Sequence, residues 1–508
     1  MDEFRSSGPE PLPPAHAASS GFAIRYLLSG IAIAVLALAT ILGALQIGGS
    51  GSPSIGSLLT FLVILSILWG ALLLEIPRRP FSLHLMHLIA MYIFLAVAPL
   101  YQVIYGLFPL ELLARVDSRY VLRANLLVTL WLLFYLAFYS VGRRLTLLRL
   151  ARRGETRLAR VVSPWRINAA LLVSFGVMGY LAALGLAGIT TRAGAFEAVA
   201  TAGSSPLMLI NNVFVRAFPV VALGAGGLLL ARSFRATALF TGPLVLLASL
   251  GNLYVNNPLA SARYWTISVL LGFIAPHVLQ RRATAVLMLV GVICGFAVLP
   301  GLGNARDANS FAEMLAYVRE VPSPALYLAR SGDVGSYGIF ILVLRYIDRD
   351  GLRLGQQLAG VLLFWVPRSV WHAKPIGTGA FVASHFGFDF TNLSAPIVAE
   401  AVVDFGCIGV ALLAALFGLV LSRLDTVFWR RSDGGASAVR SIDTVYPFLL
   451  GLVVFMTRGD LLSSFGYTLG FVASAIPPFF LGGRSVSRSA PFLERPNGRR
   501  GRTEDALG

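Results

Sequence analysis

The chain has little of what most soluble enzymes rely on. Only 13% of its 508 residues are charged, whereas 56% are hydrophobic. It has two cysteines, Cys294 and Cys407, and both fall inside apolar runs. A disulfide framework and a cysteine-based metal site are therefore excluded. Lys374 is the only lysine, so nearly all positive charge comes from arginine.

Acidic residues are scarce as well, because 24 Asp and Glu stand against 41 Lys and Arg, for a formal net charge of +17. A charge of this sign is common in nucleic-acid-binding proteins, but no compact basic domain is present. In a membrane protein, arginines in short loops set the topology and face anionic lipid. We therefore expect membrane lipid as a partner and no nucleic acid.

Long apolar runs are what the sequence has in abundance. Runs of about 20 residues predict membrane-spanning helices. We expect twelve, at 22–47, 55–76, 85–108, 121–141, 167–188, 206–231, 236–255, 261–280, 283–301, 396–422, 444–458 and 461–482. The predicted fold class is therefore an all-α polytopic integral membrane protein with about 12 transmembrane helices.

Arginine predicts the orientation of these helices. The loop 142–166 has eight Arg and one Glu, which places it in the cytoplasm. Counting spans from this loop puts both termini in the cytoplasm and the long segment 302–395 outside. That outer segment carries eight Lys and Arg against seven Asp and Glu, so its location is consistent with the rule.

The expected organisation has five parts. A Pro-, Ala- and Ser-rich disordered cytoplasmic tail at 1–21, without the features of a signal peptide, precedes the first nine spans at 22–301. The extracytoplasmic loop 302–395 separates them from the last three spans at 396–482. A basic cytoplasmic tail follows at 483–508.

The outer loop is too long for a plain connector and contains amphipathic pieces. Ser336–Arg349 forms a helix with one apolar face. Gln357–Val366 is apolar but too short to span a membrane, and it stops at Pro367. We expect these helices to lie on the outer leaflet or to dip into it.

The stretch 365–409 concentrates ionisable residues between apolar runs: Arg368, His372, Lys374, His385, Glu400 and Asp404. Charges beside membrane spans are costly to keep, which favours a functional site. The alternative is a solvated loop with interfacial anchors.

Glu400 and Asp404 are four residues apart, so they share one helical face near the outer start of the tenth span. Such a pair suits a general base or a group that orients a hydroxyl, and the alternative is a charge partner for an arginine. We favour Glu400 as the base because it lies nearer the outer surface, with Asp404 orienting an arginine. His372 is the competing base, since histidine titrates near neutral pH.

Three arginines extend the candidate site. Arg216 lies in the middle of the sixth span and must face a cavity or a partner, of which a buried carboxylate is the plainest. Arg263 opens the eighth span, where an interfacial anchor is the alternative. Arg458 begins the tight turn Arg458-Gly459-Asp460, which could simply cap helix ends.

Evidence for a metal or cofactor is weak. Asp348-Arg349-Asp350 matches the acidic pair that binds metal and diphosphate in many sugar transferases, but a three-residue pattern in a charged turn has little specificity. His84 and His87 share a helical face near the cytoplasmic side, without acidic neighbours in the sequence, and we interpret them as interfacial packing residues. We expect metal-independent chemistry without a cofactor.

The run FWVPRSVWHAKPIGTG (364–379) resembles a block of the Wzy-type O-antigen and exopolysaccharide polymerases. Further pieces agree in order: NNPLASARYW (256–265), SGDVGSYGIF (331–340), AEAVVDFGCIG (399–409) and TRGDLL (457–462). The resemblance covers roughly residues 200–470, and the first five spans match only as hydrophobic helices.

The resemblance implies a glycosyltransferase of the bacterial inner membrane, similar to the C-type glycosyltransferases. Such enzymes polymerise undecaprenyl-pyrophosphate-linked oligosaccharide repeat units into O-antigen, capsule or exopolysaccharide at the outer membrane face. A flippase and a chain-length regulator of the same pathway are then expected partners. Because arginine forks bind diphosphate, we expect Arg216, Arg263, Arg368, Lys374 and Arg458 to bind the donor's pyrophosphate.

Two other functions stay open at this point. A flippase or other transporter of lipid-linked oligosaccharide would place its charges along a path through the bilayer. Here, apart from Arg216, they gather at one face and in one loop. An O-antigen ligase of the same superfamily uses the same donor, and the sequence does not separate it from a polymerase.

Overall fold

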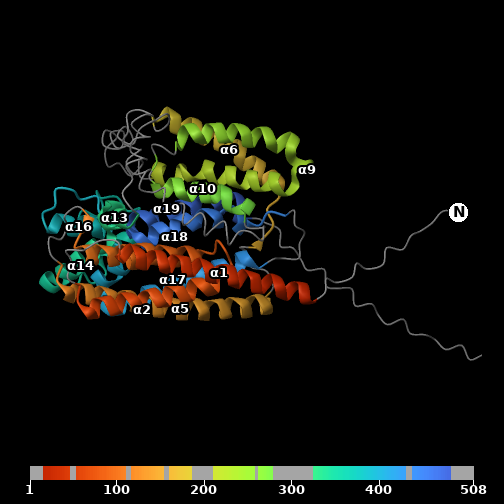
Figure 1. Ribbon diagram of the computed structural model, residues 1–508. Coiled ribbons are helices and arrows are strands. Elements are labelled where there is room, and N and C mark those ends of the chain that lie inside the picture. The colour runs from red at the N-terminus through yellow and green to blue at the C-terminus, as the bar shows by residue number, and fades with distance from the viewer. Residues whose placement is uncertain are drawn as a thin grey trace, which may run out of the picture.

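The computed structural model describes residues 15–45, 53–109, 116–153, 159–185, 210–257, 261, 263–278, 324–430 and 438–481. Nearly all of these residues are helical. The helices run side by side along one axis (Figure 1). An all-α fold is therefore confirmed for the described part of the chain.

The first part of the chain supplies one flank of the bundle. Its helices are α1 (Ala15–Leu45), α2 (Ile55–Glu75), α3 (Leu83–Tyr92), a π-helical turn (Ile93–Val97), α4 (Ala98–Tyr105) and α5 (Ser118–Arg153). The segment Leu83–Tyr105 is the most enclosed of the apolar segments, with 89% of its most apolar stretch buried, against 28% for Tyr26–Leu45. The middle segment is thus a core element, and α1 faces the surroundings.

The next helices form a separate flank, at the top of Figure 1. They are α6 (Pro164–Ala183), a π-helical turn (Asn211–Val215), α9 (Ala217–Val255) and α10 (Arg263–Val278). The long α9 is a hairpin, because Ser233 has non-helical backbone angles and Asn252 donates to the carbonyl of Pro219 at 3.3 Å. Its two arms correspond to the two spans expected at 206–231 and 236–255.

The remaining elements combine short helices with three longer ones. They are α13 (Pro324–Arg330), α14 (Ser336–Asp350), α15 (Gln356–Leu362), α16 (Thr378–His385), α17 (Ile397–Trp429), α18 (Tyr446–Arg458) and α19 (Leu461–Ala475). The helix expected at Ser336–Arg349 is confirmed as α14, and α15 ends before Pro367 as expected. The first nine residues of α14 are buried, and the helix packs between α5 and α17.

Seven described helices are long and apolar enough to cross a membrane, which supports a membrane protein. The expected spans coincide with described helices except 283–301, which lies outside the described residues. The count of twelve therefore stays a prediction. α10 and α18 are shorter apolar helices, and they pack against each other inside the bundle.

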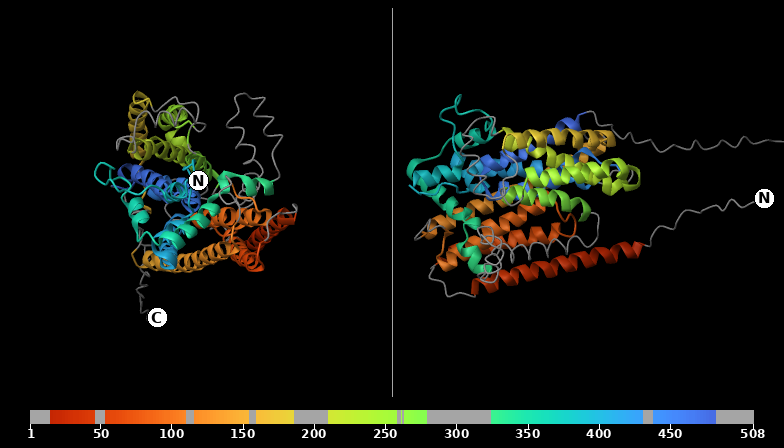
Figure 2. Two further views of the ribbon diagram at one scale, coloured as in Figure 1. Left: turned by 90° about the vertical axis from the view of Figure 1, so that its left-hand side faces the viewer. Right: turned by 90° about the horizontal axis from the view of Figure 1, so that it is seen from above.

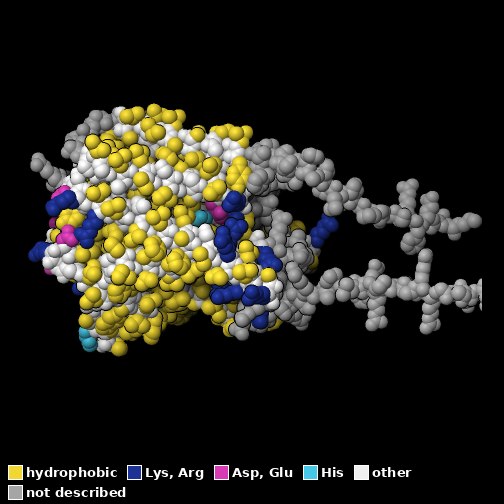
Figure 3. All heavy atoms as spheres, turned by 90° about the horizontal axis from the view of Figure 1, so that it is seen from below, with side chains coloured by type: hydrophobic (Ala, Val, Ile, Leu, Met, Phe, Trp, Pro, Cys, Tyr) yellow, Lys and Arg dark blue, Asp and Glu magenta, His cyan; other side chains and the backbone are white. Residues whose placement is uncertain are grey.

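The two ends of the bundle differ in charge. Helices α13, α14 and α16 gather at one end, which we call the loop end (Figures 1 and 2). Basic side chains gather at the opposite end, with an acidic side chain beside them, and the loop end also carries both signs (Figure 3). This division follows the arginine pattern of the sequence.

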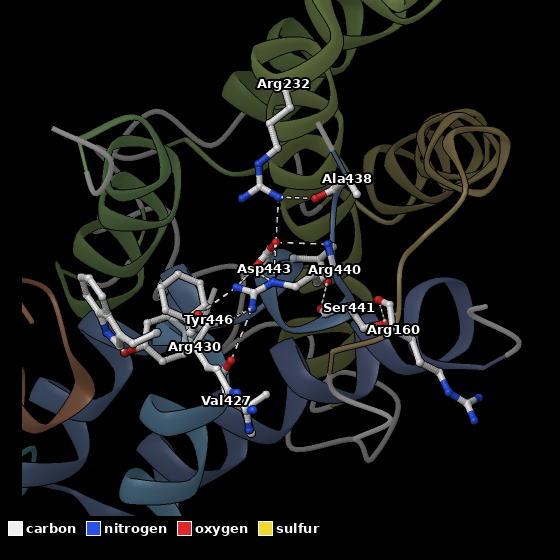
Figure 4. A network of polar contacts seen from close by, with 12 residues as sticks. Arg160, Arg232, Val427, Arg430, Ala438, Arg440, Ser441, Asp443 and Tyr446 are labelled. Carbon is white, nitrogen blue, oxygen red and sulfur yellow. Dashed lines mark hydrogen bonds and ion pairs between the residues drawn. The ribbon is translucent and has the colours of Figure 1, made fainter. Parts of the chain in front are cut away.

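A buried ionic clamp ties helices together at the arginine-rich end (Figure 4). Asp443 accepts from Arg232 at 2.8 Å and from Arg440 at 2.7 Å, and its side chain is 2% exposed. Arg440 also donates to the carbonyls of Phe428 and Arg430 at the end of α17. The clamp therefore joins the bend of α9, the end of α17 and the start of α18.

Candidate functional site

The first two turns of α17 hold both predicted carboxylates. All residues from Ile397 to Asp404 are buried, and Glu400 is 1% exposed. At Phe405 and Gly406 the helical backbone breaks, and Gly406 has a φ of +60°, which favours glycine. Although Glu400 and Asp404 are one turn apart, they have different partners.

Glu400 belongs to a carboxyl pair. Its Oε1 accepts from the backbone N–H of Leu461 at 3.2 Å, and its Oε2 accepts from the hydroxyl of Thr378. Its carboxyl group is adjacent to that of Asp460, because Leu461 directly follows Asp460 and because Gly377, beside Oδ2 of Asp460, directly precedes Thr378. The pair therefore joins α17 to the turn between α18 and α19, with α16 alongside.

Asp460 has a second function as the N-cap of α19. Its side chain accepts from the backbone N–H of Leu462 at 3.4 Å and from the hydroxyl of Ser463 at 3.2 Å. Burial raises the pKa of Asp460 above the ordinary aspartate range, and its hydrogen bond with Glu400 opposes the rise. Unlike Glu400, it is only partly buried.

Gly377 is the residue that lets this pair pack closely. A Cβ atom at position 377 would lie 2.3 Å from Oδ2 of Asp460, well inside van der Waals contact. Thr378, the next residue, donates to Glu400. Gly377 thus contacts Asp460, and Thr378 contacts Glu400.

Asp404 caps the short helix α15. Its carboxylate accepts from the backbone N–H groups of Gln357 at 3.1 Å and Leu358 at 2.7 Å. Among the described residues no arginine is ion-paired with Asp404, and the guanidinium of Arg353 lies 4.4 Å from the ring centre of Phe381. Asp404 therefore attaches the outer loop to α17, and its carboxylate oxygens accept hydrogen bonds from backbone N–H groups of that loop.

Arg216 lies at the start of the α9 hairpin. Its Nε donates to Asn256 and its Nη2 to Ser261, both at 2.7 Å, and its guanidinium lies 5.4 Å from the ring centre of Trp265. Among the described residues, no carboxylate is ion-paired with it. The buried-carboxylate alternative is therefore wrong for this part of the chain, and the charge is held by neutral groups.

The start of α10 brings the three predicted arginines into one region. Arg263 begins α10, and its side chain lies outside the described part. The following residues are in contact with the other two cations: Tyr264 lies 5.2 Å from Arg458, and Trp265 lies beside Arg216. Arg458 also donates to the carbonyl of Asp333 at 2.8 Å.

Arg368 and Lys374 brace the loop from which they come. Lys374 Nζ donates to the carbonyl of Val366 at 2.9 Å, and Arg368 donates to the carbonyl of Lys374 at 2.6 Å. Burial, and then the charge of Arg368, lowers the pKa of Lys374. Phe364, a second carbonyl partner of Lys374, stacks on Phe214 near Arg216, with ring centres 6.0 Å apart.

The other candidates lie outside this cluster. His372 is exposed. Asp348 pairs with Arg123, and Asp350 lies 3.1 Å from His385, so the two acids of the metal-like pattern have separate partners. No group of three or more potential metal ligands occurs in the described ranges.

Sequence reasoning missed Asp460 as a site residue. The signal was present, because an acid directly before an apolar run is a common N-cap and here it lies in an outer turn. Its partner Glu400 is 60 residues away in the sequence, so no local pattern could reveal the contact.

Comparison with known proteins adds nothing to these observations, because no protein-family model, no curated protein and no solved structure matches the chain.

Proposed function

We propose that this protein is a glycosyltransferase that polymerises lipid-diphosphate-linked oligosaccharide repeat units, with undecaprenyl pyrophosphate as the lipid carrier. The observation that carries the proposal is Arg216. It is a partly buried guanidinium whose hydrogen-bond partners in the described part of the chain are neutral, and it lies in the same region as Arg458 and the start of α10. Removing a cation even partly from water is costly where no counter-charge lies among the described residues, and an anionic ligand lowers that cost.

A diphosphate is the anion that suits this region. Guanidinium groups bind phosphate oxygens through paired N–H donors, and they stabilise charge as it develops on a leaving group. Arg216 and Arg458 come from different helices. Arg216 lies beside Trp265, and Arg458 lies beside the adjacent residue Tyr264. This arrangement supports electrostatic activation of a diphosphate by fixed arginines.

The surroundings agree with a lipid-linked donor. Seven long apolar helices provide the membrane setting in which a polyprenyl chain dissolves. Asp460 of the carboxyl pair directly precedes α19, and Tyr467 of α19 packs against Trp265, the ring beside which Arg216 lies. A leaving-group site and a carboxylate for the acceptor hydroxyl thus share one structural element.

An O-antigen ligase would use the same donor and the same two kinds of group, so the acceptor separates the two enzymes. A flippase would move the donor without making a glycosidic bond. We favour the polymerase because the resemblance in 364–379 points to it.

The test uses purified protein in vesicles with synthetic undecaprenyl-diphosphate-linked repeat units. We expect products of increasing repeat number without added lipid A core. Transfer only to a lipid A core acceptor would show a ligase, and movement of unextended donor across the bilayer would show a flippase. Either result would overturn the polymerase proposal.

Arg216→Lys tests the leaving-group site, because lysine keeps the charge and loses the fork. We expect donor affinity to fall by roughly tenfold to a hundredfold, as the loss of about 1.5–3 kcal/mol of charge-assisted hydrogen bonding predicts. Arg330→Lys is the matched control, since Arg330 is exposed at the end of α13. Equal donor affinity in the two variants would remove Arg216 from the site.

A further inference from the structure

We propose that Asp460 is the base that takes the proton from the attacking sugar hydroxyl, and that Glu400 behind it holds a second, shared proton. This inference rests on the proposed function and changes the assignment that the sequence favours, in which Glu400 itself is the base. It follows from how the two acids are buried and from what each of them already binds.

Exposure distinguishes the two carboxyl groups. Glu400 is 1% exposed and lies against Thr378 and Leu461, so a sugar hydroxyl has no access to it in this structure. Asp460 is only partly buried, and its hydroxyl partner Ser463 is exposed. Of the pair, Asp460 is therefore the member that a substrate at the loop end can reach.

The difference in burial decides which acid of the pair holds the shared proton. Glu400 accepts one bond on each oxygen, from Leu461 and Thr378, and Asp460 accepts from Leu462 and Ser463. Two carboxyl groups in direct contact cannot both be ionised, so one proton lies between them. The neutral acid belongs on the deeper side, because burying a charge costs more there. Glu400 then donates to an ionised Asp460.

The position of Asp460 relative to Arg216 fits a transfer reaction. Ser463 and Tyr467 are four residues apart on one face of α19. The ring centre of Tyr467 lies 5.6 Å from that of Trp265, and the guanidinium of Arg216 lies 5.4 Å from the same Trp265 ring. Seven residues of helix separate Asp460 from Tyr467, a rise of about 10 Å. Asp460 and Arg216 therefore lie near the two ends of this stretch of α19. Asp460 would face the acceptor, and Arg216 would bind the diphosphate.

The acceptor hydroxyl oxygen forms a bond to the anomeric carbon of the donor sugar, and its proton moves to Oδ of Asp460. The bond between that carbon and the pyrophosphate oxygen breaks, and the electron pair leaves with the lipid pyrophosphate. No oxidant, reductant or further reactant is needed. Release of the proton from Asp460 to solvent restores the pair.

The experiment compares Asp460→Asn with Asp389→Asn in the vesicle assay. Asparagine is also a good N-cap, so the first change keeps the start of α19 and removes the base. Asp389 is an exposed aspartate of the same outer region and provides the matched control. We expect Asp460→Asn to lower kcat by at least about a hundredfold at unchanged donor affinity, the scale of general-base catalysis. Asp389→Asn should keep wild-type turnover.

Two further measurements keep the inference falsifiable. Asp460→Glu restores a carboxylate and should recover part of the turnover that Asp460→Asn loses. Infrared spectroscopy of the protein without substrate should show a protonated carboxylic acid at neutral pH that disappears in Glu400→Gln. Glu400→Gln should lower turnover less than Asp460→Asn does, because glutamine can still donate a hydrogen bond to Asp460.

The outcomes separate this inference from the proposed function. If the wild type polymerises and Asp460→Asn turns over normally while Glu400→Gln is inactive, Glu400 is the base and the inference is wrong. If both variants polymerise normally, the pair is only structural, and the proposed function stands without it. If the wild type makes no polymer, the proposed function fails and removes the basis for a base at Asp460.

Discussion

Nδ1 of His87 lies 2.8 Å from the hydroxyl oxygen of Thr457, deep between α3 and α18. The other ring nitrogen, Nε2, lies 3.1 Å from the indole nitrogen of Trp131, which can only donate. The proton of His87 must then be on Nδ1, which donates to the hydroxyl of Thr457. That hydroxyl in turn donates to the carbonyl of Val453 at 2.8 Å. A single tautomer thus links α5, α3 and α18 just before Arg458.

Thr457→Val tests this link. Valine has nearly the same shape but no hydroxyl, so the N–H of His87 loses its acceptor in a buried site. We expect the free energy of unfolding to fall by about 1–3 kcal/mol. The measurement is denaturation in mild detergent, and Thr457→Ser, which keeps the hydroxyl, should lose clearly less. Equal losses in the two variants would show that the methyl group, and not the hydrogen bond, matters.

His87 also shows where sequence reasoning stops. The spacing of His84 and His87 predicts a shared face, and the lack of acidic neighbours in the sequence led us to expect packing at the membrane interface. In the structure both histidines are buried, and the backbone N–H of His84 lies 3.1 Å from the carboxylate of Asp425, which is 341 residues away. Partners this distant in sequence leave no local pattern.

The elements themselves follow from local signals. Apolar runs predict the helices because a membrane span requires about 20 such residues, and the described helices fall where these runs lie. The loop helices α14 and α15 follow from amphipathic periodicity and from Pro367. The partners of Arg216 and Glu400 could not be predicted, because they depend on how distant helices pack.

Asp404 shows the same limit on a shorter scale. Its spacing from Glu400 predicts a common face, but the kink at Phe405–Gly406 and the return of the chain at Gln357 give it backbone donors. The position of Asp404 at the N-terminus of α15 could not be predicted from its sequence spacing to Glu400.

The ionic clamp at the arginine-rich end gives a second prediction. Asp443→Asn keeps the size of the side chain and removes the only carboxylate that pairs with Arg232 and Arg440 in the described part of the chain. Removing one partner from a buried ionic group leaves uncompensated charge, so we expect a loss of about 3–5 kcal/mol in unfolding free energy. Thermal unfolding in detergent measures it. A variant as stable as the wild type would show that the backbone carbonyl acceptors suffice for both arginines.

Orientation can be tested directly. The arginine distribution predicts that the loop end, including the short 3-10 helix Gly332–Val334, faces the outside. A reporter enzyme that is active only after export, inserted near Gly332, should be active, and the same reporter inserted in 142–166 should be inactive. The reverse pattern would invert the topology and put the carboxyl pair in the cytoplasm, where an outer-face polymerase could not use it.

The pH dependence of turnover follows from the raised pKa of Asp460. The ionised carboxylate is the active form of a base, so kcat falls as the pH drops through the pKa of that group. Burial raises this pKa, and the decline should therefore occur at higher pH than for an exposed aspartate. The group that faces Asp460 across the pair is Glu400 of α17, and neutral donors come from α19.

Profiles of kcat between about pH 4 and pH 8 should show the shifted acid limb in the wild type and in Asp389→Asn. An acid limb at the ordinary aspartate value would contradict Asp460 as the base.

Gly377 offers the sharpest structural test of the carboxyl pair. Its backbone angles, φ −54° and ψ 143°, suit any residue, so alanine there causes no backbone strain. The added methyl group would instead lie 2.3 Å from Oδ2 of Asp460, so the carboxylate must move from its position in the pair. We expect Gly377→Ala to lower kcat by roughly tenfold or more, because a displacement of about 1 Å in a catalytic group can cost a hundredfold.

The matched control is Gly466→Ala on α19, where a new Cβ would make an ordinary contact of 3.5 Å with Phe364. If Gly377→Ala polymerises like Gly466→Ala while both are equally stable, the geometry of the pair does not matter for the reaction, and neither acid is the base.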